Sequence, residues 1–156
     1  MSGTGKSTVL VELAKRGHRV VDTDYGGWCE DVMAPDGSGP EQLWREDRMS
    51  ALLAEDAAGP LIVSGCTRNQ GKFYDRFDAV VLLSVPVGVL LERVGSRVNN
   101  PFGKDPAGRE RIMQDLETVE PLLRATSTAE IDGSQPLHEV VDAVEALALG
   151  GSSKIN

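Results

Sequence analysis

The sequence is poor in cysteine, because Cys29 and Cys66 are the only two among its 156 residues. They do not form a CxxC pair, so the sequence indicates neither a disulfide framework nor a zinc site. Such sparse cysteine is typical of proteins in a reducing compartment, and we expect a cytoplasmic location.

Positive charge is also scarce, with 16 lysines and arginines against 24 aspartates and glutamates and a net charge of −8. A chain of this charge has no general electrostatic attraction to nucleic acid or to an anionic membrane surface. Any polyanion that it binds must meet a local basic site. We therefore expect neither nucleic acid nor a membrane among its partners.

Long hydrophobic runs are missing as well. The longest apolar stretch, residues 79–91, is interrupted by Ser84, Pro86 and Gly88, which makes it too broken to span a bilayer. The sequence does not open on a basic segment followed by an apolar one, so we do not expect export.

The residues that are present suffice for one core, since 40% of them are hydrophobic. We expect a single domain over residues 1–149, followed by a loose tail over residues 150–156. The apolar spacing and the breaker residues predict helices over residues 7–16, 41–58, 86–97, 107–124 and 137–149. They predict strands over residues 18–22, 61–63, 79–85 and 129–132. Strands that alternate with helices favour an α/β fold, with an open parallel sheet and helices on each side.

A phosphate-binding motif stands at the start of the chain. Gly5-Lys6-Ser7 completes the P-loop pattern GxxxxGK followed by Ser or Thr, and a predicted helix comes next. Glycines let backbone N–H groups turn toward the β-phosphate, Lys6 neutralises the β and γ oxygens, and the Ser7 hydroxyl is offered to Mg²⁺. The alternative is a flexible N-terminus that happens to precede a helix. We predict nucleotide contacts from Gly3, Thr4, Gly5, Lys6, Ser7 and Thr8.

The motif is cut at its beginning. Counted back from Gly5, its first glycine would fall one position before Met1, and no strand precedes the loop. In P-loop folds the loop follows a buried strand, usually the middle strand of the sheet. We therefore expect Met1 to be an internal methionine of a longer chain, whose additional residues form an apolar strand ending in glycine. A chain that began at Met1 would lack this strand and be poorly stable.

Two further motifs accompany the loop. Asp22-Thr23-Asp24 follows the next predicted strand, and Arg93 and Arg97 lie four residues apart on the helix after residues 79–85. With these motifs the chain resembles the group of shikimate kinase, gluconate kinase and adenylate kinase over nearly its whole length. It also resembles small bacterial proteins described as AAA-family ATPases or kinase-like proteins. The resemblance implies a P-loop NTPase three-layer sandwich with strand order 2-3-1-4-5, strand one being the missing one, and ATP and Mg²⁺ as cofactors.

The resemblance also implies roles for the two motifs. Asp22 would lie near Mg²⁺ and Asp24 against the acceptor hydroxyl, with turn chemistry at a strand end as the alternative. Arg93 and Arg97 match lid-helix arginines that stack on adenine or reach the phosphates, and residues 98–106 would form the lid. A solvated arginine stripe is the alternative for these two residues.

The acceptor region is expected over residues 24–58 and in the loop after residues 61–63. There Gly65 permits close approach, Arg68 can hold an anionic group, and Gln70 can read hydroxyls or amides. The acceptor signatures of shikimate kinases and adenylate kinases are both absent, so the sequence does not name the acceptor. We predict acceptor contacts from Asp24, Arg45, Gly65, Arg68 and Gln70.

We predict phosphoryl transfer from ATP, dependent on Mg²⁺, to a small hydroxylated or acidic metabolite. The predicted catalytic residues are Lys6, Asp24 and Arg97, and the predicted metal ligands are Ser7 and Asp22. Ser134 and Pro136 follow the last strand, where the resemblance implies contacts with adenine. Two alternatives stay open: a regulatory ATPase without a small-molecule acceptor, and an inactive form truncated at its N-terminus. The sequence does not distinguish a monomer from a homodimer.

Overall fold

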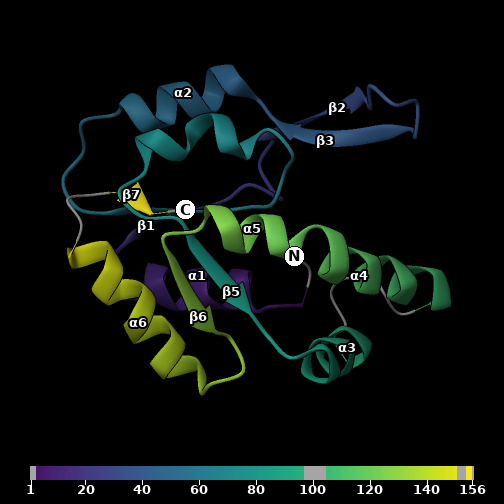
Figure 1. Ribbon diagram of the computed structural model, residues 1–156. Coiled ribbons are helices and arrows are strands. Elements are labelled where there is room, and N and C mark those ends of the chain that lie inside the picture. The colour runs from purple at the N-terminus through teal and green to yellow at the C-terminus, as the bar shows by residue number, and fades with distance from the viewer. Residues whose placement is uncertain (1–2, 97–104, 151–153, 156) are drawn as a thin grey trace.

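The computed structural model describes residues 3–96, 105–150 and 154–155. Its helices and strands follow one another from the P-loop to the C-terminus (Figure 1). In chain order they are α1 (Lys6–Lys15), β1 (Arg19–Asp22), β2 (Cys29–Met33), β3 (Pro40–Trp44), α2 (Glu46–Ala54), β4 (Leu61–Ser64), the 3₁₀ helix η1 (Gln70–Arg76), β5 (Val81–Ser84), α3 (Val87–Ser96), α4 (Pro106–Thr118), α5 (Glu120–Thr126), β6 (Ala129–Asp132), α6 (Leu137–Gly150) and β7 (Lys154–Ile155).

Four of the strands form two parallel pairs. β1 pairs with β4 along its whole length, and β5 pairs with β6 in the same way. A groove lined by both β4 and β5 lies between the pairs. β1, β4, β5 and β6 therefore correspond to strands 2, 3, 4 and 5 of the predicted order 2-3-1-4-5. The prediction of a P-loop parallel α/β fold is confirmed.

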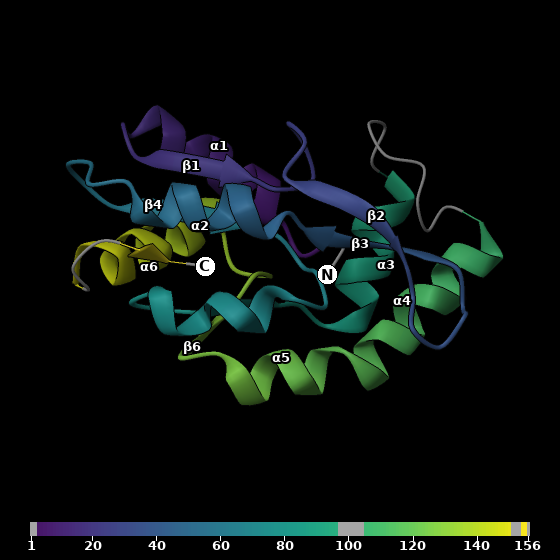
Figure 2. The ribbon, with the colours of Figure 1, turned by 90° about the horizontal axis from the view of Figure 1, so that it is seen from above.

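Helices cover both faces of β4, and all four residues of this strand are therefore buried. Ile62 packs in one cluster with residues of α1 and α6, whereas Leu61 and Val63 pack in a second cluster with residues of α2 and η1. This alternation follows from the two-residue period of a strand. The result is the predicted three-layer arrangement, which Figure 2 shows from a second side.

The predicted helix over residues 41–58 is wrong at its beginning. Residues 40–44 form β3 instead, which pairs antiparallel with β2 from Cys29↔Trp44 to Met33↔Pro40. The hairpin turns within residues 34–39, where the Asp36 carboxylate accepts a hydrogen bond from the Ser38 N–H and Gly37 has a φ of 75°. Asp followed by Gly is a turn signal, and pairing with β2 outweighs the helical spacing of Leu43 and Trp44.

Two other element predictions need correction. The predicted helix over residues 107–124 is interrupted at Val119, because Pro121 cannot continue the hydrogen-bond ladder of α4 and instead occupies the first turn of α5. Within the predicted loose tail, the backbone of residues 154–155 pairs with Leu61 and Ile62 of β4 as strand β7. In the described ranges, no helix is long and apolar enough to cross a membrane.

The ion pair between Arg124 of α5 and Glu130 of β6 predicts a pH dependence of stability. Arg124 Nε and Nη2 each donate to the Glu130 carboxylate at 2.9 Å, which lowers the pKa of Glu130 from 4.5 to about 2. A carboxylate whose pKa is depressed by folding stabilises the fold above its unfolded pKa. This contribution is lost as the pH falls from about 4.5 to about 2.

We expect Glu130→Gln to lower the free energy of unfolding at neutral pH by at most about 1 kcal/mol, because the pair is partly exposed. The difference from the parent chain should disappear as the pH approaches 2. Urea unfolding at several pH values measures it, with Glu110→Gln on an exposed position of α4 as the control. A difference that stays constant over this pH range contradicts the expectation.

Candidate functional site

The loop ahead of α1 has the backbone conformation that a phosphate-binding loop requires. Gly3 and Gly5 have φ angles of 87° and 99°, a region that side-chain-bearing residues rarely adopt, and Gly5 is the N-cap of α1. Thr4 between them is 2% exposed. The first N–H groups of a helix have no intrahelical partners, so the start of α1 is suited to bind an anion. Lys6 and Ser7 are its first two residues.

Segments from distant parts of the chain pack directly against this loop. A Cβ added to Gly3 would stand 2.8 Å from Val94 Cγ2 in α3, and one added to Gly133 after β6 would stand 2.9 Å from the Thr4 carbonyl oxygen. Nη1 of Arg93 lies 3.8 Å from the position of a Cβ on Gly5. The predicted nucleotide-binding residue Arg93 is therefore next to the loop.

Ser7 and Asp22, the two predicted metal ligands, are in direct contact. The Ser7 hydroxyl donates to Oδ2 of Asp22 at 2.7 Å, while Oδ1 of Asp22 accepts from the Asp24 N–H at 3.2 Å. The start of α1 and the carboxyl end of β1 thus meet at one point. Ligands of open α/β sheets bind at this edge.

The Ser7 hydroxyl and the Asp22 carboxylate suit Mg²⁺, which shares its ligands with waters and phosphates. They are too few for a metal ion held by protein side chains alone. Among the described residues, no group of three or more His, Cys, Asp or Glu side chains is placed to hold a metal ion. Mg²⁺ prefers oxygen ligands and is usually bound through one or two carboxylates, waters and substrate phosphates. A hydroxyl and a carboxylate beside a phosphate-binding loop match this pattern.

The loop that carries Asp24 is held from α2 by Arg48. Its Nη1 donates to the carbonyl oxygens of Gly26 at 2.8 Å and Gly27 at 2.7 Å, and its guanidinium lies 4.3 Å from the centre of the Trp28 ring. Asp24 itself is exposed. The sequence does not predict this role of Arg48, because it requires α2 to pack beside the loop.

A buried polar cluster lies beneath the same loop. The Trp44 indole donates to the Thr23 hydroxyl at 2.9 Å, which in turn donates to the Ser64 carbonyl at 2.9 Å. A Cβ added to Gly65 would stand 2.1 Å from Thr23 Oγ1 and 3.0 Å from the Trp44 ring. The close approach at Gly65 is therefore made by Thr23 and Trp44, and the predicted acceptor contact of Gly65 stays a prediction.

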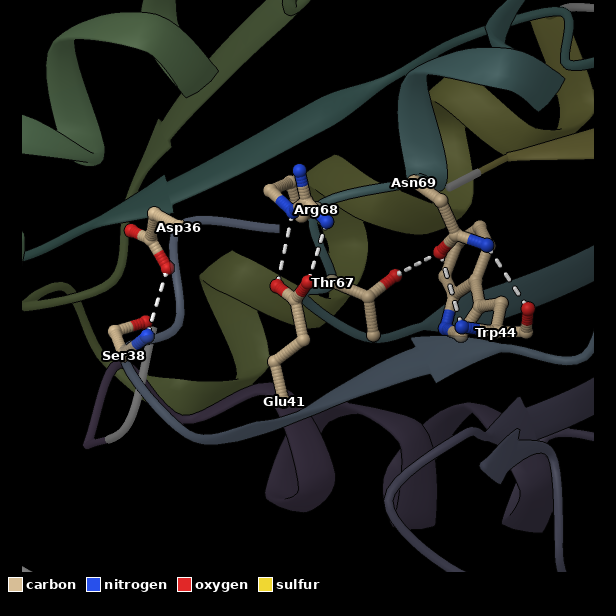
Figure 3. Close-up of polar contacts among 7 residues, drawn as sticks. All are labelled: Asp36, Ser38, Glu41, Trp44, Thr67, Arg68 and Asn69. Carbon is tan, nitrogen blue, oxygen red and sulfur yellow. Dashed lines mark hydrogen bonds and ion pairs between the residues drawn. The ribbon is translucent and has the colours of Figure 1, made fainter. Parts of the chain in front are cut away.

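The segment after β4 is tied to β3 by Asn69 and Arg68 (Figure 3). The Asn69 side chain accepts from the Trp44 N–H at 3.0 Å and donates to the Trp44 carbonyl at 2.9 Å, as a paired strand would. Arg68 points toward Glu41, and its Nε and Nη2 donate to the two carboxylate oxygens. The guanidinium that was predicted to hold an anionic acceptor thus has a carboxylate partner within the chain.

The other two predicted acceptor residues also contact the protein. Gln70 is buried, donates to the Tyr74 hydroxyl at 2.7 Å and accepts from the Thr67 N–H at 3.2 Å. Arg45 is partly exposed and lies 3.6 Å from the Asp47 carboxylate. Of the predicted acceptor residues, Asp24 is exposed, and its backbone N–H contacts the Asp22 carboxylate of the Ser7–Asp22 pair.

The predicted adenine loop after β6 is shaped by Asp132. Its Oδ1 accepts from the N–H and the hydroxyl of Ser134, at 2.8 and 2.6 Å, and these bonds hold the pKa of Asp132 below its ordinary value. The Pro136 carbonyl accepts from the Val140 N–H in the first turn of α6. Ser134 and Pro136 border the loop that meets Thr4, although their predicted adenine contacts stay a prediction.

Two predictions concern residues at the margin of this site. Arg97 lies outside the described residues, and so does most of the predicted lid over residues 98–106. Thr8 is exposed in the first turn of α1.

Comparisons with known proteins give a family and a fold for the chain. A family model described as AAA domain matches residues 1–114. One similar solved structure is shikimate kinase from Acinetobacter baumannii in complex with shikimate, with a TM-score of 0.61 and 21% sequence identity. The similarity covers 95% of this chain and 88% of that one, and at this identity it shows the fold alone. No curated protein sequence matches the chain.

The left-handed backbone of Gly5 predicts a selective effect of alanine on nucleotide binding. We expect Gly5→Ala to weaken binding of ATP with Mg²⁺ by roughly tenfold or more, because a Cβ strains this φ and faces Arg93. The matched control is Gly88→Ala in α3, where φ is ordinary and nothing lies within 4 Å of an added Cβ. Isothermal titration calorimetry compares the two. Equal affinities for both variants contradict the assignment of the loop.

The contacts of Arg48 predict that it orders the Asp24 loop. We expect Arg48→Met, which keeps the apolar stem, to increase acrylamide quenching of Trp28 fluorescence because the two carbonyl contacts and the ring contact are lost. Arg48→Lys should keep part of the protection of Trp28 from quenching. Arg111→Met on an exposed position of α4 is the control. Unchanged quenching in Arg48→Met argues against this role.

Proposed function

We propose that this chain, which belongs to the AAA domain family, transfers the terminal phosphoryl group of ATP to a hydroxyl group of a small molecule. The observation that carries the proposal is the 2.7 Å hydrogen bond from Ser7 to Asp22, with Asp24 two residues further along. It joins a phosphate-binding loop to a pair of carboxylates. Phosphoryl transfer depends mainly on alignment and charge neutralisation, which such an arrangement can provide.

The nucleotide side of the proposal depends on the loop and its neighbours. The backbone N–H groups at the start of α1 bind the phosphate oxygens, and Lys6 neutralises the charge that they carry. Arg93, next to Gly5, adds a second cation on the side of α3. Ser7 and Asp22 would hold Mg²⁺, which would neutralise negative charge on the phosphates.

The acceptor side depends on Asp24. Asp24 is exposed, and it directly follows Thr23, which is buried. The buried neighbour therefore fixes the main-chain position of Asp24. An oxygen of the Asp24 carboxylate accepts the hydrogen bond of the acceptor hydroxyl and takes up its proton as the acceptor oxygen bonds to the γ-phosphorus. The bond from the γ-phosphorus to the β–γ bridging oxygen breaks, and ADP leaves. Arg48 keeps the loop in place through the Gly26 and Gly27 carbonyls.

A hydroxylated acceptor without a carboxylate suits this site better than an acidic one. The Arg68 guanidinium is engaged by both oxygens of Glu41, and a bidentate pair of this kind satisfies the fork of the guanidinium. An anionic acceptor would have to displace Glu41. We also propose a cytoplasmic location, supported by the free thiols of Cys29 and Cys66.

The proposal predicts that Asp24 acts on the acceptor and Lys6 on the nucleotide. We expect Asp24→Asn to lower acceptor-dependent ADP release by about a hundredfold or more while ATP affinity stays unchanged. Lys6→Ala should abolish turnover and weaken ATP binding. A panel of hydroxylated metabolites, nucleosides and antibiotics serves to find the acceptor.

The matched control is Asp56→Asn, an exposed aspartate in the loop after α2, which should leave both quantities unchanged. ATP hydrolysis that no compound in a broad panel accelerates would count against the kinase and favour a regulatory ATPase. Equal effects of Asp24→Asn and Asp56→Asn would remove Asp24 from the mechanism.

A further inference from the structure

Ser64 carries a buried hydroxyl that has no role in the proposed mechanism. It is the last residue of β4 and is 9% exposed. Its Oγ is shielded from solvent and has no hydrogen-bond partner among the residues that the structure describes. A buried hydroxyl without a partner costs free energy, so a group of this kind often belongs to a binding or catalytic site.

The pairing of β1 with β4 fixes the side of the sheet to which Ser64 points. Asp22 and Ser64 are partners in the parallel ladder, on strands roughly 4.8 Å apart, and partners of this kind share a face. Two residues earlier, the partners Val20 and Ile62 both pack in the cluster that contains residues of α1 and α6. Because a strand has a period of two residues, Ser64 faces the α1 side, as Asp22 does.

The start of α1 lies on this side of the sheet. Its first turn contains Ser7, whose hydroxyl donates to the Asp22 carboxylate at 2.7 Å. Lys6 and Thr4 line the groove between β4 and β5 together with Ser64. Ser64 thus stands where the N-terminus of α1, the predicted metal ligands and the predicted phosphate-binding lysine meet. A ligand bound at this point lies on the side to which Ser64 points.

We infer that Ser64 is a positioning residue for the metal ion of the nucleotide complex, and that its hydroxyl accepts a hydrogen bond from a water bound to Mg²⁺. Mg²⁺ gives up its waters reluctantly and keeps several of them when it binds to a protein. A serine hydroxyl has two acceptor lone pairs, so Ser64 can hold such a water. The inference rests on the proposed binding of ATP with Mg²⁺.

The chemistry at the end of β4 differs from that at the end of β1. Asp22 attracts a metal ion by its charge, whereas Ser64 is neutral and can only orient the waters around the ion. A second carboxylate at the buried position of Ser64 would be costly, because both burial and the neighbouring charge of Asp22 oppose its ionisation. Ser64 therefore contributes to the alignment of the metal, and the charge of the site stays with Asp22 and Lys6.

The experiment measures binding of the non-hydrolysable ATP analogue AMP-PNP by isothermal titration calorimetry, once with Mg²⁺ and once with EDTA. The Kd in EDTA divided by the Kd in Mg²⁺ is the contribution of the metal. We expect Ser64→Ala to lower this ratio by about fivefold, the effect of one hydrogen bond, without weakening binding in EDTA. The Tm of the unliganded chain should not fall, because the substitution removes a hydroxyl that has no partner.

The matched control is Ser127→Ala. Ser127 lines the same groove, but it precedes β6 and so lies at the opposite edge of the sheet, and its hydroxyl donates to the Arg124 carbonyl at 3.1 Å. Its replacement should leave the ratio unchanged. Ser64→Thr keeps the hydroxyl and should keep most of the metal contribution.

Three outcomes would contradict these expectations. Equal ratios for Ser64→Ala and the parent chain would overturn the inference and leave the proposed function intact. A ratio that falls as far in Ser64→Thr as in Ser64→Ala, or a lower Tm of unliganded Ser64→Ala, would assign Ser64 to packing and overturn the inference too. A parent chain that binds AMP-PNP neither with Mg²⁺ nor with EDTA would overturn the proposed function, and this inference with it.

Discussion

The hydrogen bond between Ser7 and Asp22 is the contact on which the rest of the site depends. It joins the first turn of α1 to the carboxyl end of β1, so the predicted phosphate-binding loop and the carboxylates that we propose for the metal and the acceptor are held in fixed positions relative to one another. Parallel strands end at the same edge of a sheet, which brings the loops after β4 and β6 to this point as well. Chemistry that relies on alignment needs such a shared edge.

The support for this edge comes from a buried cluster that no single segment could form. Thr23 lies between two residues whose carboxylates we assign to the site, and its hydroxyl is fixed by the Trp44 indole and the Ser64 carbonyl. Gly65 leaves the space that this packing needs. Asn69 then binds both backbone groups of Trp44. Hydrogen-bonded buried networks of this kind rigidify the residues above them.

Strands buried on both faces could be predicted from the sequence, whereas the exposed hairpin strands could not. β4 and the strand around Val81 to Ser84 are largely apolar, and their runs predicted strands without knowledge of the fold. β2 and β3 have polar residues on both faces, because Glu30 stands opposite Leu43 on one face and Gln42 stands opposite Asp31 on the other. Their sequences therefore carry no clear alternation. Their pairing is a contact between segments about ten residues apart, and the turn at Asp36 was the one local signal for it.

The sequence by itself determined the phosphate-binding loop and the Asp22–Asp24 pair, because these depend on glycine backbone freedom and on residues adjacent in the chain. Tertiary structure alone decided which arginines remain available. Arg93 stands beside Gly5, whereas Arg68 is bound by Glu41 and Arg48 by the carbonyls of Gly26 and Gly27. The sequence shows where each arginine stands, but its partner depends on which segments the fold brings within hydrogen-bond distance of its guanidinium.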